Sequence, residues 1–411
     1  MPSWMYFVLA LAGLLAGYCV YGAIVEKVFG PDPNRPTPAC KMPDGVDYVE
    51  MSPTKVFLIQ LLNIAGLGPV FGPILGALYG PIALLWVVIG CVFAGAVHDY
   101  FSGMLSVRYN GKSVPDIVGY NLGDLIKKLM RVFAVVLLIL VGVVFVAGPA
   151  GLLSQLTGMH SMLFVAIIFA YYFLATILPV DKIIGRVYPF FAVLLVFMAV
   201  GLLGALAFKG YTFYSNIEWT MHSPSGLPAW PLVFITIACG ACSGFHATQS
   251  PLMARCINNE KHGRKIFYGA MIAEGVIGLI WVTLGMSFYS DTAALAAALG
   301  PKGNAALVVN NISVELLGVF GGALAVLGVV VLPVTSGDTA FRSARLVLAD
   351  WFKIDQKKWQ NRLMLCVPVL GVGAILGIGN ALGKIDYTVI WRYFSWTNQT
   401  LAMIVLWAAS M

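Results

Sequence analysis

Long apolar runs separated by short polar segments dominate the chain. A helix of about 20 apolar residues can cross a hydrocarbon core of roughly 30 Å. We predict about eleven such spans, at residues 5–25, 56–80, 81–107, 131–157, 161–178, 187–208, 230–251, 266–288, 316–348, 363–382 and 387–410. A polar loop over residues 26–55 follows the first span, and a short surface helix is expected within residues 291–315. The pattern predicts an all-α polytopic membrane protein, and the apolar run that reaches Met411 is typical of a chain that continues further.

Composition and charge agree with this class. Of the 411 residues, 60% are hydrophobic and 10% are charged, whereas soluble domains have about 45–50% and about 25%. Basic residues concentrate in cytoplasmic loops of membrane proteins. If the N-terminus lies outside, 21 of the 25 basic residues fall on the cytoplasmic side, leaving Lys209, Lys302, Lys384 and Arg392 opposite. The net charge of +7 is thus a topology signal rather than a nucleic-acid signal, and its distribution predicts an outside N-terminus and a cytoplasmic C-terminus.

Two spans are interrupted by glycine and proline, at residues 64–73 (with a second interruption at Gly72-Pro73) and at residues 238–246. They are five spans apart, so equivalent helices cross the membrane in opposite directions. This spacing predicts one transmembrane domain built as a five-plus-five inverted repeat. Residues 1–55 would be an extra helix and loop, residues 56–208 the first repeat and residues 230–411 the second. The alternative is that these glycines only allow close helix packing.

A broken span in hydrocarbon leaves backbone groups that protein or water must satisfy, so it is tolerated where it lines a cavity. Transporters hold their substrates at such breaks, near the midplane. We therefore expect a substrate site formed by the breaks and the polar side chains near them: Asn63, Gly66, Gly68, Pro69, Gly72, Gly240, Ser243, Gly244, His246, Gln249, Asn398 and Gln399.

Polar residues inside other spans suggest ion coupling. The hydroxyls of Thr335 and Ser336, with carbonyls from Ala65, Gly66 and Gly68, would make an oxygen cage suited to Na⁺; the alternative is bonding of the hydroxyls to their own helix. Glu274 is a candidate for proton coupling, or else a partner of the broken backbone.

Four further polar residues, in two pairs, also have a structural interpretation. Asp338, a further coupling candidate, is spaced to pair with Arg342 at i and i+4. His98 and Asp99 are adjacent, so they should point in different directions; we expect either polar helix packing or proton relay.

The seven cysteines do not form a disulfide pattern. Cys239 and Cys242 make a CxxC without a second pair, and we interpret them as small packing residues rather than a metal or redox site. Neither an HExxH nor a GxSxG motif is present, so we do not expect an enzyme. No cofactor is expected beyond a coupling ion, Na⁺ or H⁺.

Several segments together resemble the carbon starvation protein A family of bacterial membrane transporters. They are IAGLGPVFGPILGALYGP at 64–81, GAVHDY at 95–100, SVRYNGKS at 106–113, ITIACGACSGFHA at 235–247, SGDTAFRSAR at 336–345 and TNQTLA at 397–402. The resemblance implies a LeuT-like core and ion-driven uptake of small nutrients such as peptides or pyruvate. Long members carry paired histidines where this chain has residues 60–63, and a different run at residues 250–255, so the substrate does not transfer directly.

The leading functional hypothesis is an ion-coupled symporter that imports pyruvate, an amino acid or a short peptide. The alternatives are a passive channel or facilitator, for which two opposed broken helices are not needed, and a membrane nutrient sensor. The expected partners are this small-molecule substrate and the lipid bilayer, with no nucleic acid.

Overall fold

The structure is a computed structural model that describes residues 3–45, 47–177, 180–214, 219, 221–300 and 303–411. Helices make up nearly all of its regular structure, with a single β-bridge between His222 and Pro228. Leu178, the predicted end of the fifth span, and Lys302 lie outside the described residues.

The first half of the chain forms helices α1 to α11. Their bounds are α1 Met5–Ala16, α2 Gly22–Phe29, α3 Pro38–Lys41, α4 Pro53–Ile64, α5 Gly68–Gly76, α6 Ile82–Ile89, α7 Ala96–Arg108, α8 Val114–Leu122, α9 Asp124–Thr157, α10 Ser161–Ile177 and α11 Val180–Phe208. Single π-helical turns, Gly17–Tyr21 and Gly90–Gly95, join α1 to α2 and α6 to α7, so each pair makes one continuous span.

The second half forms helices α12 to α18. Their bounds are α12 Ala229–Thr236, α13 His246–Ala254, α14 Gly269–Phe288, α15 Thr292–Leu299, α16 Ala305–Phe352, α17 Trp359–Ala381 and α18 Tyr387–Ser410. The expected surface helix is present as α15, where the Asp291 carboxylate accepts a hydrogen bond from Ala294 N at 2.7 Å and caps the first turn. α16 begins before the predicted residue 316, and Gly318, with a φ of 71°, kinks it.

Length and apolarity identify the helices that can cross a membrane. Among the described residues, seven helices meet this requirement, or eight when α4 and α5, bent by 48° at their break, count as one span. α10 is a shorter apolar helix, at Ser161–Ala175. The multi-pass helical architecture is thus confirmed, while the count of eleven spans stays a prediction.

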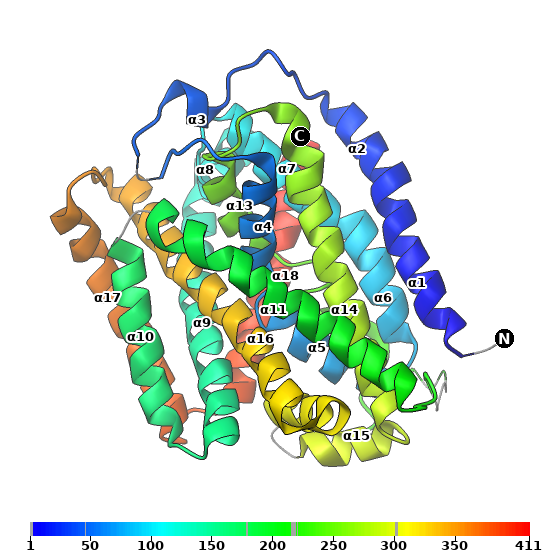
Figure 1. Ribbon diagram of the computed structural model, residues 1–411. Coiled ribbons are helices and arrows are strands. Elements are labelled where there is room, and N and C mark those ends of the chain that lie inside the picture. Colours follow the sequence, from blue (N-terminus) through cyan, green and yellow to red (C-terminus); the bar gives the residue numbers. More distant parts are fainter. Residues whose placement is uncertain (1–2, 46, 178–179, 215–218, 220, 301–302) are drawn as a thin grey trace.

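The two broken spans lie beside each other in opposite directions. The Gln60 amide of α4 donates to the Ser250 hydroxyl of α13 at 3.3 Å, and Gly76 of α5 faces the Ile237 side chain at the end of α12. The first half of one span therefore packs against the second half of the other, as an inverted repeat requires. In Figure 1, α3 and α8 lie at one end of the bundle and α15 at the other, and the two chain termini lie toward opposite ends.

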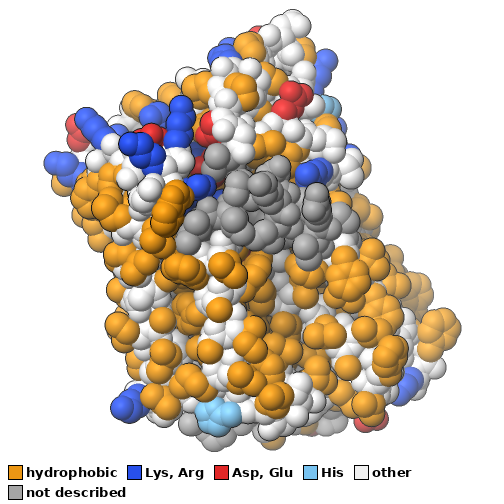
Figure 2. Space-filling view, turned by 60° about the vertical axis from the view of Figure 1, so that its left-hand side comes forward, with side chains coloured by type: hydrophobic (Ala, Val, Ile, Leu, Met, Phe, Trp, Pro, Cys, Tyr) orange, Lys and Arg blue, Asp and Glu red, His pale blue; other side chains and the backbone are white. Residues whose placement is uncertain are grey.

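The surface has the distribution of a membrane protein. On the face in Figure 2, Lys and Arg side chains gather at the upper end, and hydrophobic side chains cover most of the described surface below. Large apolar side chains such as Val193, Val200 and Ile375 are more than 60% exposed, which suits contact with lipid.

Helix α8, which the hydrophobic pattern did not predict, is linked to α9 by ion pairs. The Asp116 carboxylate lies 2.8 Å from Lys127 Nζ and 2.8 Å from Arg131 Nη2. Burial opposes ionisation of Asp116, but the hydrogen bonds and charges of Lys127 and Arg131 hold the pKa of this carboxyl below its usual value. Helix α8 and these ion pairs lie at the end of the bundle that carries α3 (Figure 1).

Candidate functional site

The first break is three residues long, between Ile64 and Gly68. The last regular helical bond runs from Ala65 N to Leu61 O at 2.8 Å, and Gly66 N turns back to Ile64 O at 2.8 Å. Gly66 N is therefore unavailable to Leu62 O, its regular helical acceptor. The predicted second interruption at Gly72-Pro73 is wrong, since both residues lie inside α5.

The second break is longer and runs from Ile237 to Phe245. Gly240 there has a φ of 87°, a conformation that favours glycine. Two amides on α18 hold this segment: Asn398 Oδ1 accepts from Phe245 N at 2.7 Å and Ser243 Oγ at 3.0 Å, while Gln399 donates to Phe234 O and Cys242 O. These side chains satisfy backbone groups that the loss of helix would leave without partners.

The two breaks pack tightly against each other. A methyl group at Gly68 would lie 2.0 Å from Cys239 Cβ, and one at Gly72 would lie 3.0 Å from Thr236 O. All the break glycines named as substrate-site candidates are buried here. Gly68, Gly72 and Gly240 face the other broken span, whereas Gly66 faces Phe145 on α9 and Gly244 faces α18. The close-packing interpretation of these glycines therefore holds alongside the interruption of both helices.

The hydroxyl pair on α16 faces the first break. Thr335 Oγ1 lies 3.2 Å from Leu62 O, and Ser336 Oγ lies 3.0 Å from the same carbonyl. Both hydroxyls also lie within 2.9 Å of Leu332 O on their own helix. The two hydroxyl oxygens and the carbonyl oxygens of Leu62 and Leu332 thus form a fully buried cluster of four oxygens. The expected carbonyls of Ala65 to Gly68 are not the ones that these hydroxyls contact; the contact is with Leu62 O.

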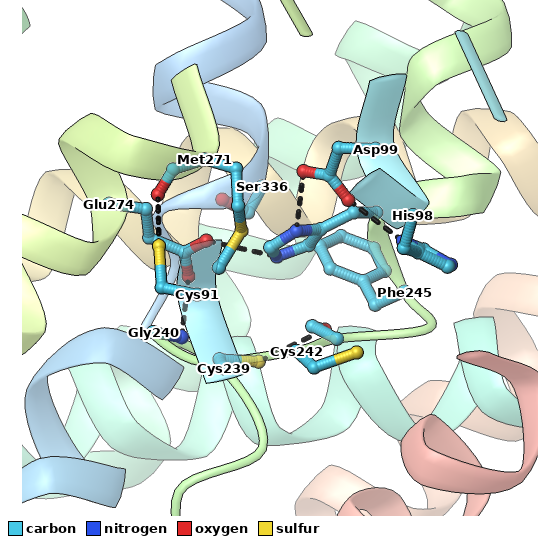
Figure 3. A network of polar contacts seen from close by, with 12 residues as sticks. Cys91, His98, Asp99, Cys239, Gly240, Cys242, Phe245, Met271, Glu274 and Ser336 are labelled. Carbon is cyan, nitrogen blue, oxygen red and sulfur yellow. Dashed lines mark hydrogen bonds and ion pairs between the residues drawn. The ribbon is translucent and has the colours of Figure 1, made fainter. Parts of the chain in front are cut away.

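Charged and imidazole side chains from three elements form a second buried cluster (Figure 3). His246 Nδ1, at the start of α13, lies 2.9 Å from Asp99 Oδ2 on α7, and His246 Nε2 lies 3.3 Å from Glu274 Oε2 on α14. Glu274 Oε1 accepts a hydrogen bond from Gly240 N at 3.2 Å, the contact with broken backbone that was one of the two expectations for Glu274. His98 Nδ1 lies 2.8 Å from Asp99 Oδ1, so the expectation that these neighbours point apart is wrong.

The other predicted polar residues are also buried. Asp338 Oδ2 accepts from the Tyr171 hydroxyl at 3.4 Å, and Arg342 Nη1 lies 3.8 Å from Asp47 Oδ1, so both also reach other elements, and their pairing on α16 stays a prediction. Gln249 donates to Thr248 Oγ1 at 3.1 Å, and Asn63 is fully buried in α4.

A cavity of about 730 Å³ lies between α5, α12, α15 and α18. Its wall includes Thr236, which directly precedes the second break, and Leu75 at the end of α5, together with Trp391 and Arg392 of α18. Arg392 is the charged residue among the described lining residues. The predicted substrate residues at the breaks are not part of this wall, and their role in binding stays a prediction.

Comparison with known families settles the relationship. The family model described as carbon starvation protein CstA matches residues 3–155 and 149–316. The chain belongs to this family. It is 49% identical over 349 residues to an uncharacterized membrane protein of Haemophilus influenzae, covering 72% of this chain and 94% of that protein.

Several relatives have functional names, and two of them represent the two functions named. The peptide transporter CstA of Campylobacter jejuni is 28% identical, over 68% of this chain and 49% of that protein. The pyruvate/proton symporter BtsT of Escherichia coli is 27% identical, over 64% of this chain and 46% of that protein. The chain spans about half the length of these two relatives.

Solved structures support the same fold. MhsT in complex with L-phenylalanine aligns with a TM-score of 0.62 at 15% identity, covering 87% of this chain and 88% of that one. A mutant of the Eremococcus coleocola manganese transporter aligns with a TM-score of 0.58 at 13% identity, covering 89% and 81%. The LeuT-like fold is confirmed, and these relatives and neighbours place the chain among transporters rather than enzymes.

Proposed function

We propose that this CstA-family chain is an ion-coupled symporter that imports a small organic nutrient, such as pyruvate, an amino acid or a short peptide. The observation that carries the proposal is the α16 hydroxyl pair at the carbonyl of Leu62, beside the first break. Ion binding there would bridge α16 and α4, two elements whose separation would disrupt the oxygen cluster. Transport of the ion would thereby be linked to rearrangement of the broken span.

Sodium is the coupling ion that this oxygen cluster favours. Unwound backbone carbonyls are the groups that coordinate Na⁺ in transporters with broken helices. Thr335, Ser336, Leu62 and Leu332 supply four neutral oxygens in a buried site. H⁺ is the alternative coupling ion, and BtsT, the E. coli relative, is named a proton symporter.

The cavity supports a small substrate with an anionic group. Its volume of about 730 Å³ falls within the range of small-molecule sites, about 300–1,000 Å³. Leu75, Leu299 and Trp391 give it an apolar wall, and Arg392 provides a positive charge. We place this cavity on the outer side of the bacterial cytoplasmic membrane, with the N-terminus outside, because the basic side chains gather at the opposite end.

The test is uptake by proteoliposomes that contain the purified full chain. Labelled pyruvate, an amino-acid mixture and a dipeptide are supplied under an imposed Na⁺ gradient, an imposed H⁺ gradient, or neither. Accumulation above the external concentration under the Na⁺ gradient supports the proposal. Equilibration at the same rate under all three conditions would identify a passive facilitator, and accumulation under the H⁺ gradient alone would exclude sodium coupling.

A further inference from the structure

Three potential metal ligands from separate segments converge beside the second break. Cys239 lies within the break, His246 begins α13 and Glu274 lies on α14, and all three are buried. The Cys239 Sγ atom, a ring nitrogen of His246 and a carboxylate oxygen of Glu274 all lie within 4.8 Å of one another. We propose that these residues bind a divalent transition metal of the zinc class, which fastens the second break to α14.

The nitrogen and oxygen already have the spacing of ligands on one ion. His246 Nε2 lies 3.3 Å from Glu274 Oε2. Two such ligands, each about 2.0–2.1 Å from a tetrahedral ion, lie about 3.3 Å apart. A thiolate at about 2.3 Å from the same ion would lie about 3.6 Å from each of them. Binding of the ion would therefore draw the Cys239 sulfur closer than its present separation of up to 4.8 Å from these atoms.

The orientation of the facing atoms also favours a metal over a direct hydrogen bond. His246 Nε2 and Glu274 Oε2 are both buried, and neither has a hydrogen-bond partner among the described residues despite their 3.3 Å separation. Buried polar atoms nearly always have a hydrogen-bond partner. Two such atoms that face each other without hydrogen-bond geometry therefore indicate a third group bound between them. An ion between them and the sulfur would engage both lone pairs.

The surroundings hold each ligand as metal sites do. A metal-bound histidine usually gives its second nitrogen to a carboxylate, which fixes the ring; here His246 Nδ1 lies 2.9 Å from Asp99 Oδ2. The second Glu274 oxygen accepts from Gly240 N at 3.2 Å. In the metal-free chain the Cys239 thiol donates to Ser243 Oγ at 3.2 Å, and metal binding would replace that thiol proton.

The competing interpretation is a metal-free chain in which a charged His246 bridges Asp99 and Glu274. It accounts for the two carboxylates and leaves Cys239 as a packing residue that donates to Ser243, but it does not explain the Nε2–Oε2 misalignment. Three protein ligands leave a fourth tetrahedral position for water or a small anion. Binding of the ion would join α13 and α14 through a segment that has lost its helical hydrogen bonds.

The test measures metal in the purified full chain after removal of any affinity tag. The chain is treated with chelator, loaded with Zn²⁺ or Co²⁺, and desalted, and its metal content is measured by mass spectrometry. We expect about one tightly held ion per chain, and in the Co²⁺ form an absorption band for thiolate-to-cobalt charge transfer. Cys239→Ser should abolish that band and the tight binding.

Cys242→Ser is the matched control, because Cys242 is buried in the same break and lies outside the ligand group. It should keep both the ion and the band. Asp99→Asn should weaken metal affinity about 10- to 100-fold, as loss of such a partner does in other metal sites. A wild-type chain that stays metal-free after loading, or a Cys239→Ser chain that binds as tightly as Cys242→Ser, would overturn the proposal. If a variant fails to fold, the presence or absence of the charge-transfer band in the Co²⁺-loaded wild-type chain still decides between the two interpretations.

Discussion

Replacing Gly68 by alanine tests whether the two broken spans depend on their close contact. The new methyl group would lie 2.0 Å from Cys239 Cβ and 2.4 Å from its Sγ. Carbon atoms pack best at about 3.5–4.0 Å, so the two breaks must separate by about 1.5–2 Å. The obstructing atom is a Cβ attached to backbone, with Cys239 Cα a further 3.4 Å contact, so rotation of a side chain cannot relieve the overlap.

Overpacking in a well-packed core costs about 1–3 kcal/mol, and we expect Gly68→Ala to reach the upper part of this range. The assay is the thermal unfolding midpoint in detergent together with initial uptake rates in proteoliposomes. Gly151→Ala is the control, because a methyl group there meets no atom within 4 Å. Adding Cys239→Gly to Gly68→Ala should recover part of the loss relative to the sum of the single variants. A Gly68→Ala chain as stable and active as the control would refute the packing described for the breaks.

Three further perturbations follow from particular contacts. Asn398→Ala should lower the free energy of unfolding by about 1–3 kcal/mol, since it leaves the buried Phe245 N–H in the second break without its acceptor. Thr400→Ala should have little effect, because the Thr400 hydroxyl bonds to its own helix. Equal thermal unfolding midpoints for the two variants would contradict this prediction. Arg392→Ala should raise the KM for an anionic substrate about two- to fivefold, because an exposed charge pair contributes about 0.2–1 kcal/mol, and an unchanged KM at low salt would separate Arg392 from the substrate path. Asp116→Asn should flatten the pH dependence of stability: because the pKa of Asp116 is lowered in the folded chain, its contribution is present above the unfolded value of about 3.9 and is lost as pH falls through the folded value. Parallel stability curves for wild type and Asp116→Asn between pH 7 and pH 3 would contradict that sign.

The sequence alone was enough to predict the multi-pass helical architecture and the two main breaks, because apolar run length and glycine-proline interruptions are local signals. It also led to the expectation that Thr335 and Ser336 lie against the first broken span, since the repeat fixes which helices are neighbours. The identity of the facing carbonyl could not be predicted. Leu62 O, rather than a carbonyl at Ala65 to Gly68, faces the hydroxyls because the helix loses its regular bonds at Gly66.

Other differences have equally local causes. Gly72-Pro73 does not break α5, because a proline inside a helix removes one hydrogen bond and is tolerated in membrane helices when neighbours compensate. The grouping of Cys239, His246 and Glu274 arises from three segments. Cys239 and Cys242 are a conspicuous pair in the sequence, but it is His246, seven residues after Cys239, that lies in the same group. Sequence motifs for metal sites rely on fixed spacings between ligands, so they do not predict a group of ligands that comes from three separate segments.

Sodium-driven accumulation by the Thr335→Ala, Ser336→Ala double variant tests the central claim most directly. Thr339→Ala is the matched control, because this hydroxyl lies one turn further on α16 and bonds to Thr335 O and Ser336 O of its own helix. A hydrogen bond or oxygen contact to a charged partner contributes about 1.5–3 kcal/mol, which corresponds to about a tenfold or greater rise in the Na⁺ concentration for half-maximal uptake per hydroxyl lost. We predict that wild type and Thr339→Ala concentrate substrate when Na⁺ is imposed outside and that the double variant does not. Equal accumulation by all three proteins, with the same Na⁺ dependence, would contradict the account.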